Sequence, residues 1–153
     1  MKFEIVFMMI VMIVASVLSC SGIIPSKLGV KDGKLAPCPN KPNCVSSQTD
    51  DPTHKIDPIT YKSSRAQAHA ILIDVIKNLK RTKIVVEKDD YVYAEFTSAI
   101  FRFVDDVEFY FDKNKNVIHV RSASRLGYSD MGVNRKRIEQ VRKLFAEKDG
   151  NLK

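Results

Sequence analysis

The sequence lacks the short motifs that identify many enzyme classes. It contains no glycine-rich phosphate-binding loop, no zinc-protease helix motif and no paired catalytic carboxylate signature. Its three histidines show no local motif that links one of them to a serine nucleophile. Asp105, Asp106 and Glu108 cannot converge on one cation, because neighbouring residues of a strand point to opposite faces. The sequence therefore assigns no catalytic residue, no metal site and no cofactor.

The apolar run at the N-terminus is too short for a stable membrane span. Residues 5–18 make a stretch of 14 residues, whereas a spanning helix needs about 20. A secretory signal peptide over residues 1–19 is predicted instead. Leu18-Ser19-Cys20 resembles a bacterial lipoprotein signal, which predicts that Cys20 is lipidated and becomes the new N-terminus. The alternatives are an ordinary cleaved signal that leaves a free thiol, or an uncleaved short anchor.

The lipoprotein interpretation also predicts a location. The protein would be anchored by lipid in the bacterial cell envelope and would face the periplasm. Ser21, directly after the cysteine, is compatible with sorting to the outer rather than the inner membrane. Residues 20–34 are polar and are predicted to be a linker that spaces the domain from the membrane.

Cysteine is scarce, with three residues in the chain. If Cys20 carries lipid, Cys38 and Cys44 remain as an even pair in an oxidising compartment, where disulfides persist. The alternative is a metal pair with His54 as the obvious third ligand, but a metal site usually needs two more ligands nearby. The disulfide is the favoured prediction.

Length and composition indicate one globular domain. The chain has 153 residues, 44% of them hydrophobic and 28% charged, and a net charge of +7. A basic protein favours anionic partners such as phospholipid headgroups, acidic glycans or nucleic acid.

Hydrophobic periodicity predicts a four-stranded antiparallel meander with one helix before it and one after it. The first helix, residues 63–80, has a capping box formed by Ser64 and Gln67. The predicted strands are 83–87, 91–98, 101–111 and 117–124, and the last helix is 132–147. Both helices can cover the apolar face of the sheet. The result is a two-layer α+β domain over residues 35–147, which begins with a Pro-rich disulfide loop and ends in a tail, 148–153.

A turn at Asn114-Lys115 sets the register between the third and fourth strands. Their apolar faces then coincide, and Glu108 lies across from Arg121 on the open face. The expected pairs on the apolar face are Phe111 with Ile118, Phe109 with Val120, and Val107 with Ser122. Phe101 and Phe103 are expected on this face too.

Asp105 interrupts the apolar face, and a buried carboxylate needs a partner. The register places it between Ser124 and Ala94. Seven residues before Val141, Asn134 points along the core stripe of the last helix. The following residues are therefore predicted to converge at one end of the core: Asp105, Ser122, Ser124 and Asn134, with Arg125 and Arg135 near enough to join.

Two interpretations of this polar cluster remain open. Arginines, hydroxyls and a helix N-terminus suit a pocket for a phosphate or carboxylate. Alternatively, three acidic residues neutralise three arginines in an internal clamp: Asp105, Asp106 and Asp130 against Arg121, Arg125 and Arg135. Asp130 or Ser129 is also suited to cap the last helix.

The open face of the sheet carries aromatic and charged residues together. Tyr91, Tyr93 and Tyr110 share it with basic and acidic side chains. Aromatic and basic residues on a sheet can stack bases, but the acidic neighbours and the export signal argue against nucleic acid. The Pro-rich segment or a partner is expected to cover this face.

Three separated segments resemble a bacterial and plastid family known as domain-of-unknown-function family 1499. They are "PCPNKPNCVSSQ", "FRFVDDVEF" and "VRSASRLGYSDMGVNRKRIEQVRKLF", and the resemblance extends over residues 35–145. The family label implies no activity. The resemblance implies that the following residues belong to the family pattern: Cys38, Cys44, Ser46, Ser47, Gln48, Asp105, Asp106, Arg121, Ser122, Ser124, Arg125, Gly127, Asp130, Asn134 and Arg135.

The predicted function is that of a lipid-anchored envelope protein with a non-catalytic binding domain. Its partners would be the membrane, through the anchor, and an anionic small molecule, a lipid headgroup or an envelope protein; no nucleic acid is expected. One alternative is a hydrolase that uses a serine from the Ser46–Ser47 loop or the Ser122/Ser124 strand. The other is a purely structural scaffold.

Overall fold

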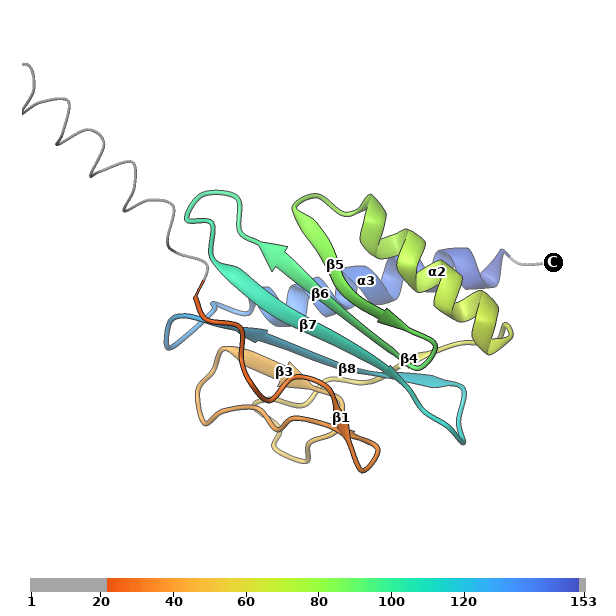
Figure 1. Ribbon diagram of the computed structural model, residues 1–153, viewed down its shortest axis with the longest axis horizontal. Helices are drawn as coiled ribbons and strands as arrows, with labels where there is room; N and C mark the ends of the chain where they lie inside the picture. The colour runs from red at the N-terminus through yellow and green to blue at the C-terminus, as the bar shows by residue number, and fades with distance from the viewer. Residues whose placement is uncertain (1–21, 152–153) are drawn as a thin grey trace, which may run out of the picture.

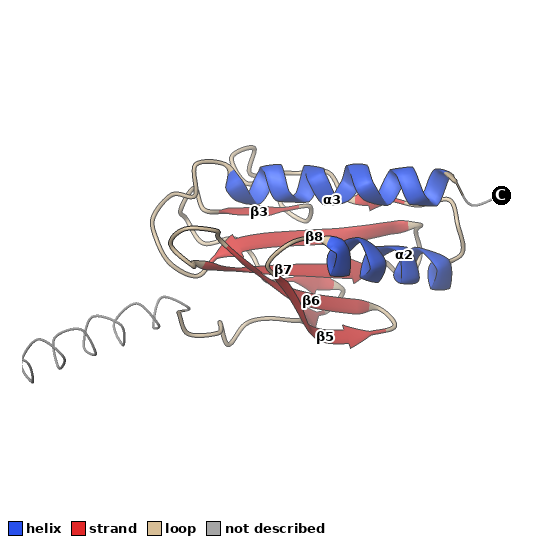
Figure 2. Cartoon of the chain, turned by 90° about the horizontal axis from the view of Figure 1, so that it is seen from above, coloured by secondary structure: helices blue, strands red, loops and turns tan. Residues whose placement is uncertain are grey.

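The computed structural model describes residues 22–151 of the chain (Figure 1). The predicted signal peptide, residues 1–19, and the predicted lipidation site Cys20 lie outside the described residues. Two helices cover one face of a mostly antiparallel sheet, which confirms the predicted α+β class (Figure 2). Among residues 22–151, no helix has both the length and the apolar composition needed to cross a membrane.

Helix α2 spans Arg65–Asn78 and begins as its sequence predicts. The Ser64 hydroxyl accepts a hydrogen bond from the Gln67 amide, and the Gln67 side chain accepts one from the Ser64 amide. This capping box satisfies two amide groups that have no partner inside the helix. The helix buries an apolar stripe against the sheet: Ala68, Leu72, Ile73, Val75 and Ile76.

Helix α3 spans Val133–Gly150, so it runs three residues beyond its predicted end. Its core stripe is buried as predicted: Ile138, Val141 and Phe145. The extra turn is held by Asp149, whose carboxylate accepts hydrogen bonds from the amides of Lys62 at 2.8 Å and Ser63 at 3.3 Å. These bonds connect the end of α3 to the segment that leads into α2.

The predicted meander is present. Its strands are β5 (Thr82–Lys88), β6 (Tyr91–Thr97), β7 (Val104–Phe111) and β8 (Val117–Ser124). The predicted register between β7 and β8 is confirmed in every pair: Phe111 with Ile118, Phe109 with Val120, Val107 with Ser122, Glu108 with Arg121 and Asp105 with Ser124. The apolar faces of the two strands therefore coincide in the core.

Two details of β7 differ from prediction. The strand begins at Val104, because the connection from β6 is a longer loop than the tight link expected near residues 99–100. Phe101 and Phe103 lie in this loop and are 68% and 41% exposed, so they are not on the core face. The longer loop also shifts the pairing with β6, so that Asp105 lies opposite Phe96 rather than Ala94.

The Pro-rich segment extends the sheet beyond the four predicted strands. Strands β3 (Cys44–Ser46) and β4 (Ile59–Thr60) both pair antiparallel with β8. They satisfy hydrogen-bonding groups of an edge that would otherwise be open. Strands of two or three residues are too short to show a period in a turn-rich sequence, so the pattern did not predict them.

The open face of the sheet is covered by the start of the described chain, up to and including Leu35, the first residue of the Pro-rich segment. Strands β1 (Val30–Lys31) and β2 (Lys34–Leu35) form a hairpin whose turn residues, Asp32 and Gly33, both have positive φ, of 52° and 74°. This is the backbone that favours a tight hairpin. The hairpin and the residues before it pack on a small aromatic cluster: Leu28 and Leu35 against Tyr91, Tyr93 and Tyr110. Residues 28–34, predicted as part of a linker, thus lie on the domain (Figure 1).

Candidate functional site

The residues of the predicted polar cluster are divided between the two faces of the sheet. Asp105 lies on the helix-covered face and Asp106 on the open face, because successive residues of β7 alternate. Ser122, Ser124 and Asn134 lie on the same face as Asp105. Arg121 and Arg125 lie on the open face with Asp106. Arg135 belongs to neither group.

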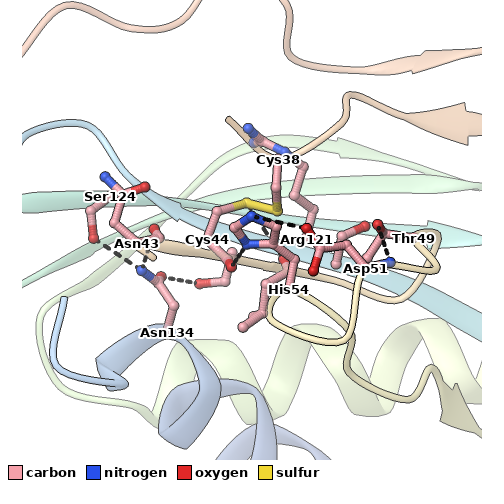
Figure 3. Close-up of a disulfide and its surroundings, with 12 residues drawn as sticks. Cys38, Asn43, Cys44, Thr49, Asp51, His54, Arg121, Ser124 and Asn134 are labelled. Atoms are coloured by element: carbon pink, nitrogen blue, oxygen red, sulfur yellow. Dashed lines mark hydrogen bonds and ion pairs between the residues drawn. A yellow bond between two sulfur atoms is a disulfide. The ribbon is translucent and has the colours of Figure 1, made fainter. Parts of the chain in front are cut away.

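Asn134 is the centre of the group on the helix-covered face. It is fully buried, and its side-chain oxygen accepts a hydrogen bond of 2.5 Å from the Ser122 hydroxyl. Its side-chain nitrogen donates to the Ser124 hydroxyl and to the Asn43 carbonyl, each at 3.0 Å (Figure 3). These bonds join α3, β8 and the disulfide loop, and they satisfy polar groups that are closed off from water.

Arg137 supplies the cation of this group and was not among the predicted residues. Its guanidinium donates to the Asp105 carboxylate at 2.5 Å and to the Asn134 side-chain oxygen at 2.6 Å. The prediction that Arg125 and Arg135 would join Asp105 was wrong. Arg137 follows Asn134 by three residues and therefore shares its side of the helix, a spacing that the sequence already contained.

Arg125 lies on the open face between two carboxylates. It donates to Asp106 at 2.7 Å and to Glu95 at 2.5 Å, and its side chain is 4% exposed. Tyr93 donates a hydrogen bond of 2.6 Å to the same Asp106 carboxylate. Burial and this hydrogen bond raise the pKa of Tyr93 above its usual range. The guanidinium of Arg125 is thus engaged in ion pairs inside the domain.

Glu108 and Arg121 form the predicted cross-strand pair. The Arg121 guanidinium lies 3.1 Å from the Glu108 carboxylate, whose side chain is fully buried. The Tyr91 hydroxyl and the Gly29 amide each donate to the other carboxylate oxygen at 2.8 Å. Burial, followed by the nearby charge of Glu108, raises the pKa of Tyr91.

Asp130 joins the group around Asn134, because its carboxylate accepts a hydrogen bond of 2.7 Å from the Asn134 side-chain nitrogen, whereas Arg135 joins neither group. Asp130 accepts hydrogen bonds from the backbone amides of Gly132 at 2.9 Å and Asn134 at 2.8 Å, at the start of α3. Arg135 donates to the Lys55 carbonyl at 2.7 Å. The polar cluster therefore resembles the predicted internal clamp, although its ion pairs are not the predicted ones between three acidic residues and three arginines.

The disulfide loop lies against the edge strand β8. Cys38 and Cys44 are bonded, with their Cα atoms 5.7 Å apart, which confirms the predicted pair (Figure 3). His54, the alternative metal ligand, instead lies with its Nδ1 atom 2.9 Å from the Cys44 carbonyl oxygen. Within residues 22–151, no three His, Cys, Asp or Glu side chains form a group suited to a metal ion.

Two of the three loop candidates have structural contacts. Ser46 is buried, and its hydroxyl accepts a hydrogen bond of 3.2 Å from the Gln48 amide. The Gln48 side chain reaches the β1–β2 hairpin, where it accepts from the Leu35 amide at 2.8 Å and donates to the Gly33 carbonyl at 2.9 Å. Gln48 thereby fixes the hairpin to the loop.

The third candidate, Ser47, lies in a row with a histidine and a carboxylate. Its hydroxyl is 3.3 Å from His119 Nδ1, and His119 Nε2 is 3.3 Å from an Asp112 carboxylate oxygen. The Val120 amide donates to the Ser47 hydroxyl at 2.9 Å and fixes its position. Sequence patterns missed this row, because Ser47 and His119 are 72 residues apart.

The carboxylate of this row is held in its ionised form. A hydrogen bond from the Asn114 amide is the largest cause that lowers the pKa of Asp112, and those from His119 and the Lys115 amide act in the same direction. With Nε2–H directed at Asp112, the His119 Nδ1 lone pair faces the Ser47 hydroxyl. This tautomer places a base beside a serine.

A basic cleft of about 700 Å³ lies where the end of α2, the end of β6 and the start of α3 meet. Four basic residues line it and no acidic residue does: Lys80, Arg81, Lys136 and Arg137. Arg137 is paired with Asp105, whereas the other three form no ion pair with any residue that the structure describes. The lining thus carries an excess of positive charge.

A second cleft, of about 730 Å³, lies between the first part of the described chain and the open face of the sheet. Tyr91, Tyr93 and Tyr110 form part of its wall. Its charged lining residues balance in number: Lys88 and Lys113 against Asp32 and Asp90. This cleft therefore has no preference for a simple anion.

The comparisons with known proteins show a family. The family described as "protein of unknown function (DUF1499)" matches residues 34–145. That match extends over most of the chain, and the protein belongs to this family. Neither the curated proteins nor the solved structures give a match to the chain.

Proposed function

We propose that the protein is a lipid-anchored bacterial envelope protein whose domain faces the periplasm and binds an anionic lipid headgroup without catalysing a reaction. The anchor is Cys20, and the outer membrane is its favoured location. The headgroup site is the basic cleft of Lys80, Arg81, Lys136 and Arg137.

The charge of this cleft is the observation that carries the proposal. Three basic side chains that form no ion pair with any carboxylate of residues 22–151 surround a volume of about 700 Å³. Small-molecule sites commonly measure roughly 300–1,000 Å³. Guanidinium and ammonium groups are the usual protein partners of phosphate. Of the two arginines first expected to bind an anion, Arg125 is instead neutralised by Asp106 and Glu95, and Arg135 donates to the Lys55 carbonyl.

The headgroup site can be tested with a soluble probe. Glycerol phosphate is titrated by calorimetry into the full chain, purified from bacterial membranes in a neutral detergent. The triple variant Lys80→Ala, Arg81→Ala, Lys136→Ala should lose at least tenfold in affinity. The matched control removes three exposed lysines that do not line the cleft: Lys77→Ala, Lys83→Ala, Lys143→Ala. Equal affinity of both variants for glycerol phosphate would show that the basic cleft is not the headgroup site.

The anchor has its own experiment. Mass spectrometry of the N-terminal peptide from protein expressed in a Gram-negative bacterium should show a processed chain that begins at Cys20 and carries acyl groups. Cys20→Ala should leave the unprocessed chain. An unmodified thiol at Cys20 in the wild type contradicts the anchor and leaves the headgroup site as a separate question.

A serine hydrolase is the second candidate function, because His119 lies within hydrogen-bond reach of Ser47 and is itself hydrogen-bonded to Asp112. In this role Ser47 is the nucleophile, His119 the general base and Asp112 the group that orients it. A fluorophosphonate probe should label Ser47, and labelling should disappear in Ser47→Ala. Ser46→Ala is the matched control, because that neighbouring hydroxyl is buried. A wild type that stays unlabelled argues against catalysis.

A further inference from the structure

Large apolar side chains are exposed mainly at one end of the domain. The β6–β7 loop, residues 98–103, carries three of them, and the β8–α3 connection with the first residue of α3 carries four. They are Ile100, Phe101 and Phe103, and Leu126, Tyr128, Met131 and Val133. Met131 and Ile100 are 90% and 82% exposed. A collection of this kind on a domain marks an interaction surface.

The two loops lie side by side. Strands β7 and β8 are antiparallel neighbours, so the start of β7 adjoins the end of β8, and the Arg125 amide donates to the Val104 carbonyl at 3.3 Å. Within the first loop, the rings of Phe101 and Phe103 stack with their centroids 5.6 Å apart. The loops form one surface at the end of the sheet where the described chain begins (Figure 1). We call this surface the apolar loop end.

The described chain begins against the apolar loop end. Gly22 packs so closely on the β8–α3 connection that a Cβ atom there would lie 3.0 Å from the Arg125 Cβ and 3.5 Å from the Leu126 Cγ. Ile23, which follows, is 93% exposed. Cys20 precedes Gly22 by two residues, and two residues of chain span at most about 7 Å. A lipid on Cys20 would therefore hold the apolar loop end close to the bilayer.

Charge at this end suits an anionic surface. The basic cleft with Lys80, Arg81 and Lys136 adjoins the β6–β7 loop, because Ser98 and Ala99 also line it. Arg102 is exposed within that loop, between Phe101 and Phe103. Apolar side chains flanked by basic residues match a bilayer interface, where apolar groups enter below the headgroups and cations attract anionic lipid.

We propose that the apolar loop end docks onto a bilayer that contains anionic phospholipid, with Phe101 and Met131 inserted below the headgroups. The inference deepens the proposed function and rests on its lipid anchor. It adds that the domain lies on the membrane in one orientation, with the basic cleft directed at the headgroups.

The absence of tryptophan from the chain allows a clean test. Met131→Trp places one fluorophore at an exposed site of the apolar loop end. The control Asn114→Trp places one at an exposed site at the opposite end of the sheet. Each full-length protein, purified from bacterial membranes, is reconstituted into vesicles of equal parts phosphatidylcholine and phosphatidylglycerol with brominated acyl chains. The docking predicts blue-shifted emission and at least twofold quenching for Met131→Trp, and neither for Asn114→Trp. Phe101→Trp provides a second reporter.

The outcomes separate the anchor from the docking. Protein that floats with the vesicles while Met131→Trp and Phe101→Trp stay unquenched overturns the docking alone. Protein that does not float overturns the anchor, and the docking with it. A blue shift that depends on protein concentration and needs no vesicles identifies a second copy of the chain as the occupant and also overturns the docking. Vesicles of phosphatidylcholine alone should reduce the quenching at least twofold, and equal quenching would refute the role of charge.

Discussion

Replacing Glu108 by glutamine tests whether the open-face charge pair stabilises the domain. Glu108 is fully buried in β7 and accepts hydrogen bonds from Arg121, Tyr91 and Gly29. Glutamine keeps the shape but removes the charge, so Arg121 is left as a nearly buried cation. Arg121 has little compensation available, because its buried Nε atom has no hydrogen-bond partner in the described part of the chain.

The magnitude follows from the distance and the burial. Two unit charges 3.1 Å apart attract each other by about 5 kcal/mol at the effective dielectric constant of 20 that suits such sites. Removal of one member of a buried ion pair typically costs about 3–5 kcal/mol. Glu108→Gln should therefore lower the free energy of unfolding by about 4 kcal/mol. With a urea dependence of about 2 kcal/mol/M, the urea midpoint should fall by roughly 2 M.

Urea denaturation followed by circular dichroism measures this change. The control is Glu139→Gln, which breaks the exposed pair of Glu139 with Arg142 and should cost less than about 1 kcal/mol. The double replacement Glu108→Leu, Arg121→Met should recover most of the lost stability, because no unpaired charge remains. A loss below about 1 kcal/mol for Glu108→Gln, equal to that of the control, would refute the reasoning.

Three further predictions concern the disulfide loop, the buried amide and the end of α3. Asn134→Ala should lower the free energy of unfolding by about 2–4 kcal/mol in urea denaturation, because it leaves buried hydrogen-bonding groups without partners; an unchanged midpoint would contradict the clamp. Cys38→Ser with Cys44→Ser should cost about 2 kcal/mol through the entropy of a short loop, and a reductant should bring the wild type to the same midpoint. Burial raises the pKa of Asp149, but hydrogen bonds from Ser63 and Lys62 outweigh it and lower the pKa below 3.8. The stabilisation by the ionised Asp149 is therefore present above pH 3.8 and is lost as the pH falls through the lowered pKa. Asp149→Asn should make the free energy of unfolding less dependent on pH in acid denaturation. A pH profile equal to that of the wild type would contradict this role of Asp149.

Local features of the fold were predictable because their causes are local. The capping box of Ser64 and Gln67 depends on residues three apart, and alternating apolar residues with a short turn determine the register of β7 and β8. The burial of Asn134 followed from its place on the apolar stripe of α3. The exception was the β6–β7 loop, where Phe101 and Phe103 continue the strand pattern in sequence but lie exposed in the structure.

The candidate site required the tertiary structure. Whether Arg125 or Arg137 meets Asp105 depends on how α3 packs on the sheet, and both are equally charged in the sequence. Ser47 and His119 become neighbours only because β3 joins the edge of β8. The basic cleft combines the end of one helix with the start of another.

The sequence by itself determined the class of the fold, the register of β7 with β8, the cysteine pair and the family, because periodicity, spacing and motifs are recorded along the chain. Only the tertiary structure decided which arginine pairs with which acid, which side chains form a cleft and which apolar residues remain exposed. These properties depend on distances between segments far apart in sequence, and no local pattern contains them.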